Sequence, residues 1–368
     1  MFFNKTMSYL LVLSCVLLFT TCGDDDEAVV SLKDTPEIEN LRAAQLADAD
    51  VYGVTPAAEA LTTRTQALAQ QLNVFLGNPT EQELINLQEA WIATSIASVQ
   101  FEMYDISKSR FITRLVVRSV YPSAVEEDLA DPDLVLDEDF FRSWKTMPYL
   151  EYLLFNAEPA EVLLQIQEDT RRQEALVAAK DYLGNQAASF TELWDSQRDE
   201  VLNNLGTVPN GGQNLLVNSL ISSLRWTVVT RLYNPIGGGV ENGEFQAGLF
   251  EAFYSKKSLE LLRASWQEWK RVFYADYGAT NTTIGFDDYL IALEEEQLLQ
   301  NIDEAVLNFD DKLNQLTSIQ DDLINNPSRL EETVEALAEV QRYIRLDLIT
   351  ALCGVLLIDD GCDYGDCD

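Results

Sequence analysis

Helix-start signals recur along this chain, whereas no stretch alternates apolar and polar residues in the way that a half-buried β-strand requires. At a helix start, a Ser or Thr side chain accepts a hydrogen bond from a free backbone N–H, and a Glu three residues later completes a capping box. Such signals stand at Thr55-Pro56, at Thr80 with Glu83, and at Ser328 with Glu331. The first helix should end at Gly77, and the second should continue through Trp91 and Phe101. The pattern predicts an all-α fold.

Two segments rich in turn residues divide the helical pattern. They cover 206–212 and 234–248, and both are rich in glycine. Around them, further helices are predicted at 138–157, 159–204, 212–233, 257–276 and 287–326. The first break separates halves that can each supply about four helices. We therefore expect two packed four-helix-bundle-like domains, at 41–205 and at 206–368.

The chain is strongly acidic, with 25 Lys and Arg residues against 61 Asp and Glu residues and a formal net charge of −36. A surface of this charge repels nucleic acids and anionic lipid head groups. It also concentrates cations, although high acidity can serve solubility alone. Nucleic acids are therefore excluded as electrostatic partners.

The 368 residues include no histidine. This absence excludes Ser-His-Asp and Cys-His catalysis, histidine-liganded zinc and histidine-ligated haem. A general acid or base would have to be a carboxylate, Lys, Tyr or Cys with a displaced pKa. A metal site would have to use oxygen or sulfur ligands, which suits iron or another hard cation.

The N-terminus has the organisation of a bacterial lipoprotein signal. Lys5 precedes an apolar run at 9–19, which is too short to span a membrane, and small polar residues precede Cys22. We predict a signal peptide at 1–21, acylation of Cys22, an acidic tether at 22–40, and a location at the outer membrane or cell surface. Cys15 has a more typical sequence before it, but cleavage there would leave an apolar stretch exposed.

The C-terminal tail combines cysteines with aspartates. Export permits disulfides, and a bond between Cys362 and Cys367 is the first choice, with Cys353–Cys362 as the second. The aspartates invite a calcium interpretation, but they lack the spacing of an EF-hand loop. A solvated acidic tail is the simpler interpretation.

Several segments form a recognisable series along the chain. In order, they are Ala90-Trp91 with Val99 to Glu102, Trp144 to Phe155, Phe253 to Leu259, Gly285 to Leu290, and an ending with Arg345 to Asp347, Gly354-Val355 and Asp359 to Gly361. Together and in this order they resemble the imelysin-like proteins, a bacterial envelope family that is linked to iron and carries a peptidase label. The family's signature helix contains Gly-x-His-x-x-Glu or, in a second branch, Gly-x-Pro-x-x-Glu. This chain has Thr146 in place of the glycine and Pro148 in place of the histidine.

The resemblance implies the family's double four-helix-bundle fold and a site between the bundles. Glu151 ends the signature and would be a ligand-binding or metal-binding carboxylate there. By analogy with the family, its neighbours would be Gln100, Tyr152, Ser255 and Ser258. From the residues alone, Glu151 could instead pair with Arg, Ser or Tyr at a domain interface, Tyr152 could belong to the core, and either serine could cap a helix.

Three functions are compatible with these observations. The first is a non-enzymatic envelope lipoprotein that binds iron, an iron complex or another small ligand. The alternative is a metal-dependent peptidase-like hydrolase, although the chain contains no recognised catalytic motif. The third is a surface lipoprotein that binds a protein, such as an outer-membrane transporter.

Overall fold

A computed structural model describes residues 35–104, 106, 120–142, 146–237, 249–278 and 282–357. Within these ranges all regular structure is helical, so the all-α prediction is confirmed. The α-helices are α1 (Pro36–Asp48), α2 (Thr55–Gly77), α3 (Glu81–Phe101), α4 (Pro122–Ala130), α5 (Glu138–Arg142), α6 (Thr146–Phe155), α7 (Pro159–Glu168), α8 (Thr170–Gln186), α9 (Ser189–Asn203), α10 (Gly212–Arg225), α11 (Ser258–Phe273), α12 (Phe286–Ala292), α13 (Glu296–Gln315), α14 (Ile319–Asn325), α15 (Pro327–Arg342) and α16 (Ile349–Ala351). The other helical segments are π-helical η2 (Ala49–Val54), η4 (Trp226–Tyr233) and η6 (Tyr343–Leu348), and 3₁₀-helical η3 (Glu102–Tyr104).

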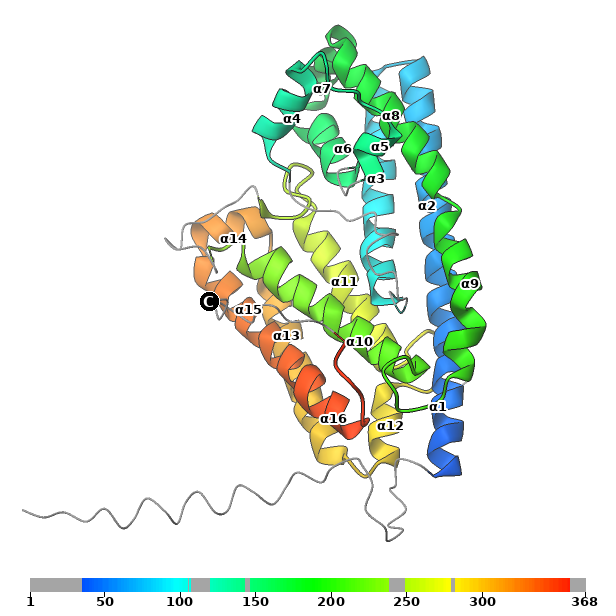
Figure 1. Cartoon of the computed structure of the whole chain (residues 1–368). Helices are drawn as coiled ribbons and strands as arrows, with labels where there is room; N and C mark the ends of the chain where they lie inside the picture. Colours follow the sequence, from blue (N-terminus) through cyan, green and yellow to red (C-terminus); the bar gives the residue numbers. More distant parts are fainter. Residues whose placement is uncertain are drawn as a thin grey trace, which may run out of the picture.

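Two hydrophobic cores organise these helices. The first core is built mainly from α2, α3, α6, α7 and α8, and Leu72, Trp91 and Leu150 are fully buried in it. The second core is built mainly from α10, α11, α13 and α15, around Trp269 and Phe309. We call the helices around them the first lobe and the second lobe. In Figure 1 the first lobe lies above and the second lobe lies below.

One continuous helical column connects the two lobes. α1, η2 and α2 follow one another without a break along the right side of Figure 1. Ile38 and Val54, near the start of the column, belong to the second core, whereas Leu72 belongs to the first. The predicted division into domains at 205 and 206 stays a prediction, because the cores follow the two halves of the chain only in part.

Of the three predicted helix caps, Thr80 is confirmed, whereas Ser328 and Thr55 do not cap a helix. Thr80 caps α3 as predicted, since its Oγ1 accepts a hydrogen bond from the Glu83 backbone N–H at 3.3 Å. The Glu83 carboxylate does not return to the cap but accepts a hydrogen bond from the Gln71 side chain at 2.8 Å. The Ser328 prediction was wrong. α15 begins one residue earlier, at Pro327, whose fixed φ suits the first helical position.

Thr55 is not a helix cap either. The chain before it is already helical, and the Thr55 backbone N–H donates to the carbonyl of Asp50, five residues earlier. This spacing is π-helical. The Thr55 hydroxyl donates to the Asp50 carboxylate at 2.8 Å instead of capping α2. Thr-Pro is a typical start of a helix, but here the preceding segment η2 is already helical. The first N–H groups of α2 therefore have carbonyl partners and need no cap.

The longest predicted helix, 159–204, is divided into α7, α8 and α9. The first division occurs at Asp169, whose carboxylate accepts a hydrogen bond from the Arg171 backbone N–H at 2.8 Å and starts α8. Asp side chains that bond to nearby backbone compete with helix continuation in this way. The segment 287–326 is likewise divided, and the Ser318 side chain caps α14. These breaks let the chain fold back into compact lobes. In the described ranges, no helix has the length and apolarity needed to cross a membrane.

Candidate functional site

Glu151 lies on α6, on the side of the first lobe that meets the second. The residue is 1% exposed, and its neighbours in sequence Leu150 and Leu154 are fully buried. Its Oε1 accepts hydrogen bonds from both the backbone N–H and the hydroxyl of Ser255, each at 2.9 Å. The backbone of Tyr254 also donates to this carboxylate. The carboxyl group of one lobe is therefore held by a turn that leads into α11 of the other.

The environment of Glu151 raises its pKa to about 7, and burial is the largest cause. The hydrogen bonds from Ser255 and Tyr254 oppose this shift, because they favour the charged form. The nearby negative charge of Glu251 raises the pKa further. Glu151 can therefore gain or lose a proton close to neutral pH, which few carboxyl groups do.

The turn that holds Glu151 has an unusual backbone. Ala252 and Lys256 have φ angles of 54° and 59°, a region that residues with a side chain rarely adopt. A hydrogen bond from the Lys257 N–H to the Ala252 carbonyl, at 3.1 Å, stabilises the turn. The same carbonyl lies 3.1 Å from the Ser255 hydroxyl and is the alternative acceptor for its single proton. The strained backbone aims the N–H groups of this turn at one carboxylate.

A buried ion cluster lies beside this turn in the second lobe. Arg231 of η4 is 4% exposed, and its guanidinium contacts Glu102 at 2.7 Å and Glu251 at 2.6 Å. The hydroxyls of Thr227 and Ser265 accept further hydrogen bonds from Arg231, at 3.1 and 3.2 Å. Although burial disfavours the charge of Arg231, the two carboxylates raise its pKa above the ordinary value. With two carboxylates and one guanidinium, the cluster keeps a net negative charge close to Glu151.

A cavity of about 10 Å³ opens next to this cluster, and Arg231, Glu251 and Ser258 contribute its polar wall. This volume accommodates about one water molecule. Leu262 and Ile319 supply apolar wall.

The four residues expected around Glu151 lie at different distances from it. Ser255 touches its carboxylate directly. Ser258 instead donates to the Glu251 carbonyl at 2.6 Å, so it does not bind Glu151. Tyr152 donates to Glu126 at 2.8 Å, and its ring packs against Tyr254 at 5.3 Å between centroids.

Gln100 is half-buried on α3, and among the described residues no hydrogen bond joins it to Glu151. Neither serine is the N-cap of α11. Lys257 occupies that position without a side-chain capping hydrogen bond, and Ser258 is already the first residue of the helix.

Sequence reasoning did not single out Arg231 or Glu251 as site residues. The available signal was a basic residue inside the apolar stretch of η4, which follows α10. Glu102 belonged to a segment that carried the family resemblance, but no role was expected for it. The partners of Arg231 come from η3 and from the turn before α11, which only the fold brings together.

Comparison with known proteins identifies the family of this chain. The imelysin family model, described as "Peptidase_M75: Imelysin", matches residues 54–345. The chain belongs to the imelysin family. No curated protein matches it.

Two crystal structures of other proteins have a similar fold. One is an imelysin-like protein from Psychrobacter arcticum 273-4, with 15% sequence identity and a TM-score of 0.63, covering 87% of this chain and 98% of that one. The other, from Parabacteroides distasonis ATCC 8503, is proposed to be an iron-regulated protein A precursor. It has 14% identity and a TM-score of 0.61, covering 85% of this chain and 95% of the other. At these identities the likeness concerns the fold.

This imelysin departs from the family signature at Thr146 and Pro148. The Thr146 hydroxyl donates to the Phe141 carbonyl at 3.0 Å, and both Thr146 and Pro148 are buried at the start of α6. A proline costs little there, because N–H groups of the first turn have no partner within the helix. The signature helix therefore keeps its shape, but it offers no imidazole beside Glu151.

The described residues of this chain contain no cluster of carboxylates and thiolates that could hold a bare iron ion. No group of three or more Cys, Asp or Glu side chains in the described ranges is placed to hold a metal ion. The nearest candidates pair with Arg231 or accept hydrogen bonds from Ser255, so their oxygens already have partners. The expected acylation site, Cys22, lies outside the described residues. Cys362 and Cys367 also lie outside them, and with them the expected disulfides of Cys362 with Cys367 or with Cys353. The same holds for Trp144 of the signature segment.

Proposed function

We propose that this imelysin is a non-catalytic binding protein of the cell envelope, anchored through an acylated Cys22. Its ligand is a small molecule or an iron complex that pairs with Glu151 at the junction of the lobes. The observation that carries this proposal is the buried carboxyl group of Glu151, which has a pKa near neutrality and is held by a single strained turn. Buried carboxyl groups with displaced pKa values concentrate at functional sites, and ligand sites concentrate between domains.

An iron complex suits the junction better than a bare ion does. Such a complex brings its own ligands, so the protein needs to supply only a few polar contacts. The negative cluster of Glu102, Glu251 and Arg231 favours a ligand that presents a positively charged or hydrogen-bond-donating part to Glu151, whatever the charge of its remainder. The name of the relative from Parabacteroides distasonis also refers to iron.

Access to Glu151 requires movement of the turn at 252–257. The donors of this carboxylate come from Tyr254 and Ser255, so a shift of one short segment would free it. A ligand with hydrogen-bond donors would then replace the turn. Its binding would be proton-linked, because a positively charged ligand favours the ionised form of Glu151.

Calorimetric titration of the mature protein with ferric citrate, haem and calcium chloride tests the proposal. We expect saturable binding of ferric citrate or haem, and at least about tenfold weaker binding by Glu151→Gln, the loss expected for a buried charged contact. Glu331→Gln, at an exposed position of α15, is the matched control and should bind like the wild type. Three flat titrations would refute the proposal. Unchanged binding together with a lowered melting temperature would make Glu151 a structural residue.

The peptidase label of the family model gives a second candidate function, a metal-dependent hydrolase. One observation favours it, since a carboxyl group with a pKa of about 7 suits a general acid or base. Hydrolysis of a fluorogenic casein should then depend on added divalent metal and disappear in Glu151→Gln. The absence of hydrolysis at any metal concentration would leave the binding function as the better account.

A further inference from the structure

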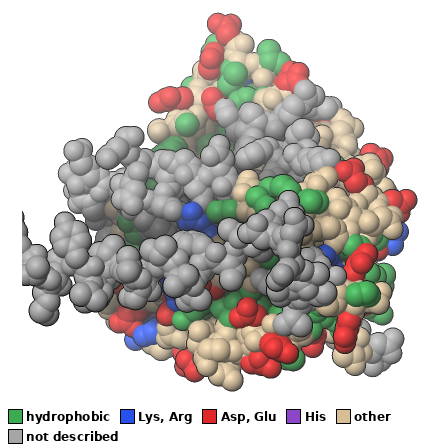
Figure 2. Space-filling view, turned by 60° about the horizontal axis from the view of Figure 1, so that its bottom comes forward, with side chains coloured by type: hydrophobic (Ala, Val, Ile, Leu, Met, Phe, Trp, Pro, Cys, Tyr) green, Lys and Arg blue, Asp and Glu red, His purple; other side chains and the backbone are tan. Residues whose placement is uncertain are grey.

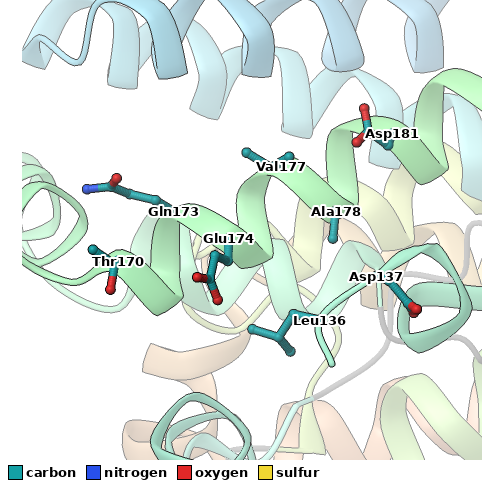
Figure 3. Close-up of a pocket in the computed structure, with 8 residues that line it drawn as sticks. All are labelled: Leu136, Asp137, Thr170, Gln173, Glu174, Val177, Ala178 and Asp181. Carbon is teal, nitrogen blue, oxygen red and sulfur yellow. The ribbon is translucent and has the colours of Figure 1, made fainter. Parts of the chain in front are cut away.

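A groove of about 600 Å³ runs along α8, on the surface of the first lobe. Figure 3 shows α8 along one side of it, with the segment around Leu136 and Asp137 facing the helix. The apolar residues of the groove are Leu136, Val177 and Ala178, and its charged residues are Asp137, Glu174 and Asp181. The lining contains no Lys or Arg. The groove therefore combines an apolar floor with an entirely acidic set of charged groups.

The two walls of the groove are fixed to each other. Arg171 of α8 donates to the carbonyls of Asp131 and Leu134, both at 2.9 Å, and so holds the opposite segment in place. One oxygen of Asp137 accepts a hydrogen bond from the Phe140 N–H at 3.1 Å and caps α5. A preformed surface of this kind loses little conformational entropy when a partner binds.

We infer that this groove binds a basic segment of a partner protein. The long side chains of Arg and Lys can place their aliphatic stems on Val177 and Ala178 while their cationic ends reach the surrounding carboxylates. Val177 is 40% exposed, and Val135, next to the groove, is 68% exposed. The apolar surface therefore extends beyond the groove itself, as a protein interface requires.

The dimensions of the groove favour a peptide over a small molecule. From Thr170 to Asp181, α8 rises about 16 Å, which an extended peptide of about five residues would span. Small-molecule sites enclose most of their ligand, whereas this groove is largely open to solvent. The same face of α8 carries the cations Arg171 and Lys180, which pair with Glu174 at 2.7 Å and Asp181 at 3.1 Å. Both carboxylates are about half exposed, so these pairs are weak and can exchange for a partner.

The alternative to docking in the groove is a general attraction of cationic peptides to the acidic surface. Carboxylates outnumber basic side chains over the face in Figure 2, so any cationic peptide is attracted to the molecule as a whole. The test must separate this general attraction from docking in the groove. Two variants with the same change in net charge do so. Asp137→Asn/Glu174→Gln/Asp181→Asn alters the groove and keeps the cap of α5, whereas Glu331→Gln/Glu335→Gln/Glu339→Gln alters exposed positions of α15.

Fluorescence anisotropy with a labelled heptapeptide, Arg-Ala-Arg-Ala-Arg-Ala-Arg, measures the binding. We expect saturable binding by the wild type, about tenfold weaker binding by the groove variant, and no change in the α15 variant. Val177→Ser leaves the charge intact and should weaken binding several-fold. Thermal melts check that each variant is folded.

Equal weakening by both triple variants would overturn the inference, and so would the absence of peptide binding by the wild type. An unaffected Val177→Ser variant would also overturn it, because the apolar floor would then play no part. Spermine in place of the peptide tests whether the groove binds small polyamines instead of a protein segment. Binding of spermine as tight as that of the peptide, with the same loss in the groove variant, would assign the groove to small polyamines instead.

Discussion

Glu151 occupies an environment that works against its own ionisation. Burial disfavours its charge, and Glu251 repels it, while only the donors from Tyr254 and Ser255 compensate. The balance leaves the pKa at about 7, above the value of 4.5 that an exposed glutamate has. Between these two values, the folded protein holds a proton that the unfolded chain releases.

This difference predicts how stability depends on pH. Because the folded state binds more protons from about pH 4.5 to about pH 7, the free energy of unfolding should fall as the pH rises through this window. The contribution of Glu151 amounts to about 3 kcal/mol as an order of magnitude. Glu151→Gln cannot ionise, so its stability should not show this pH-dependent fall. Urea denaturation of both proteins between pH 5 and pH 8 measures the difference.

The comparison with the variant isolates Glu151 from the many other carboxylates. The stability of the wild type relative to Glu151→Gln should decrease as the pH rises. A relative stability that stays constant or increases over this range would contradict the raised pKa. Glu331→Gln, at an exposed site, should show no comparable pH-dependent difference.

Arg231 is the second residue on which the junction depends. It is the cation that Glu102 and Glu251 share, and both carboxylates are less than 8% exposed. Arg231→Met would leave two buried carboxylates without a cation, and such losses cost about 3–5 kcal/mol. The triple variant Arg231→Met/Glu102→Gln/Glu251→Gln should recover part of this stability, because no uncompensated charge remains. Chemical denaturation tests both, and a loss below about 1 kcal/mol in the single variant would show that the cluster is not tightly coupled.

At the scale of elements, the π-helical segments η2 and η4 bring charged side chains into the interior. η2 carries Asp50, which is 2% exposed and accepts hydrogen bonds from the Trp194 indole at 2.9 Å and from Arg198 at 2.8 Å. η4 carries Arg231. A π-helical turn contains an extra residue and shifts the faces of the helix that follows, so it can direct a polar residue inward without ending the helix.

Gly53 in η2 gives a test of this packing. A Cβ at this position would lie 2.7 Å from the Tyr104 ring, closer than such contacts allow. Gly53→Ala should therefore destabilise the protein by about 1–3 kcal/mol through overpacking.

Gly184, on an exposed face of α8, gives the opposite case, because a Cβ added there would have no atom within 4 Å. Gly184→Ala should stabilise by about 0.5–1 kcal/mol, because alanine favours helix. Thermal melts of the two variants should shift in opposite directions, and a destabilised Gly184→Ala would contradict the argument.

At the scale of the whole molecule, the net charge determines which kind of membrane attachment is possible. The net charge of −36 disfavours electrostatic attachment to anionic membranes, so attachment would have to come from acyl chains. The helices of the described ranges include none that could replace this anchor by spanning the bilayer.

Cys22→Ala should therefore move the protein from the membrane fraction to the soluble fraction, or leave an unprocessed precursor. Cys15→Ala, at the alternative cysteine, should remain with the membrane. Fractionation after a high-salt wash, followed by immunoblotting, distinguishes the two. Retention of Cys22→Ala after the wash would contradict the assignment of the anchor.

Several features followed from the amino-acid sequence by itself. They are the all-α class, the capping of α3 by Thr80, and the family. The family resemblance also implied that Ser255 lies near Glu151, whereas the ligand-binding role of both residues stays a prediction. Helix periodicity and caps depend on residues within a few positions of one another, so a local pattern is enough to predict them.

The tertiary structure alone decided the rest. Arg231 reaches Glu102 across 129 positions of sequence, and Arg198 reaches Asp50 across 148. No local pattern encodes such pairs, because they form only when the two cores bring distant helices together. The same packing determined that Thr55 continues a helix instead of capping one, and that Glu151 is buried deeply enough to hold a proton near neutral pH.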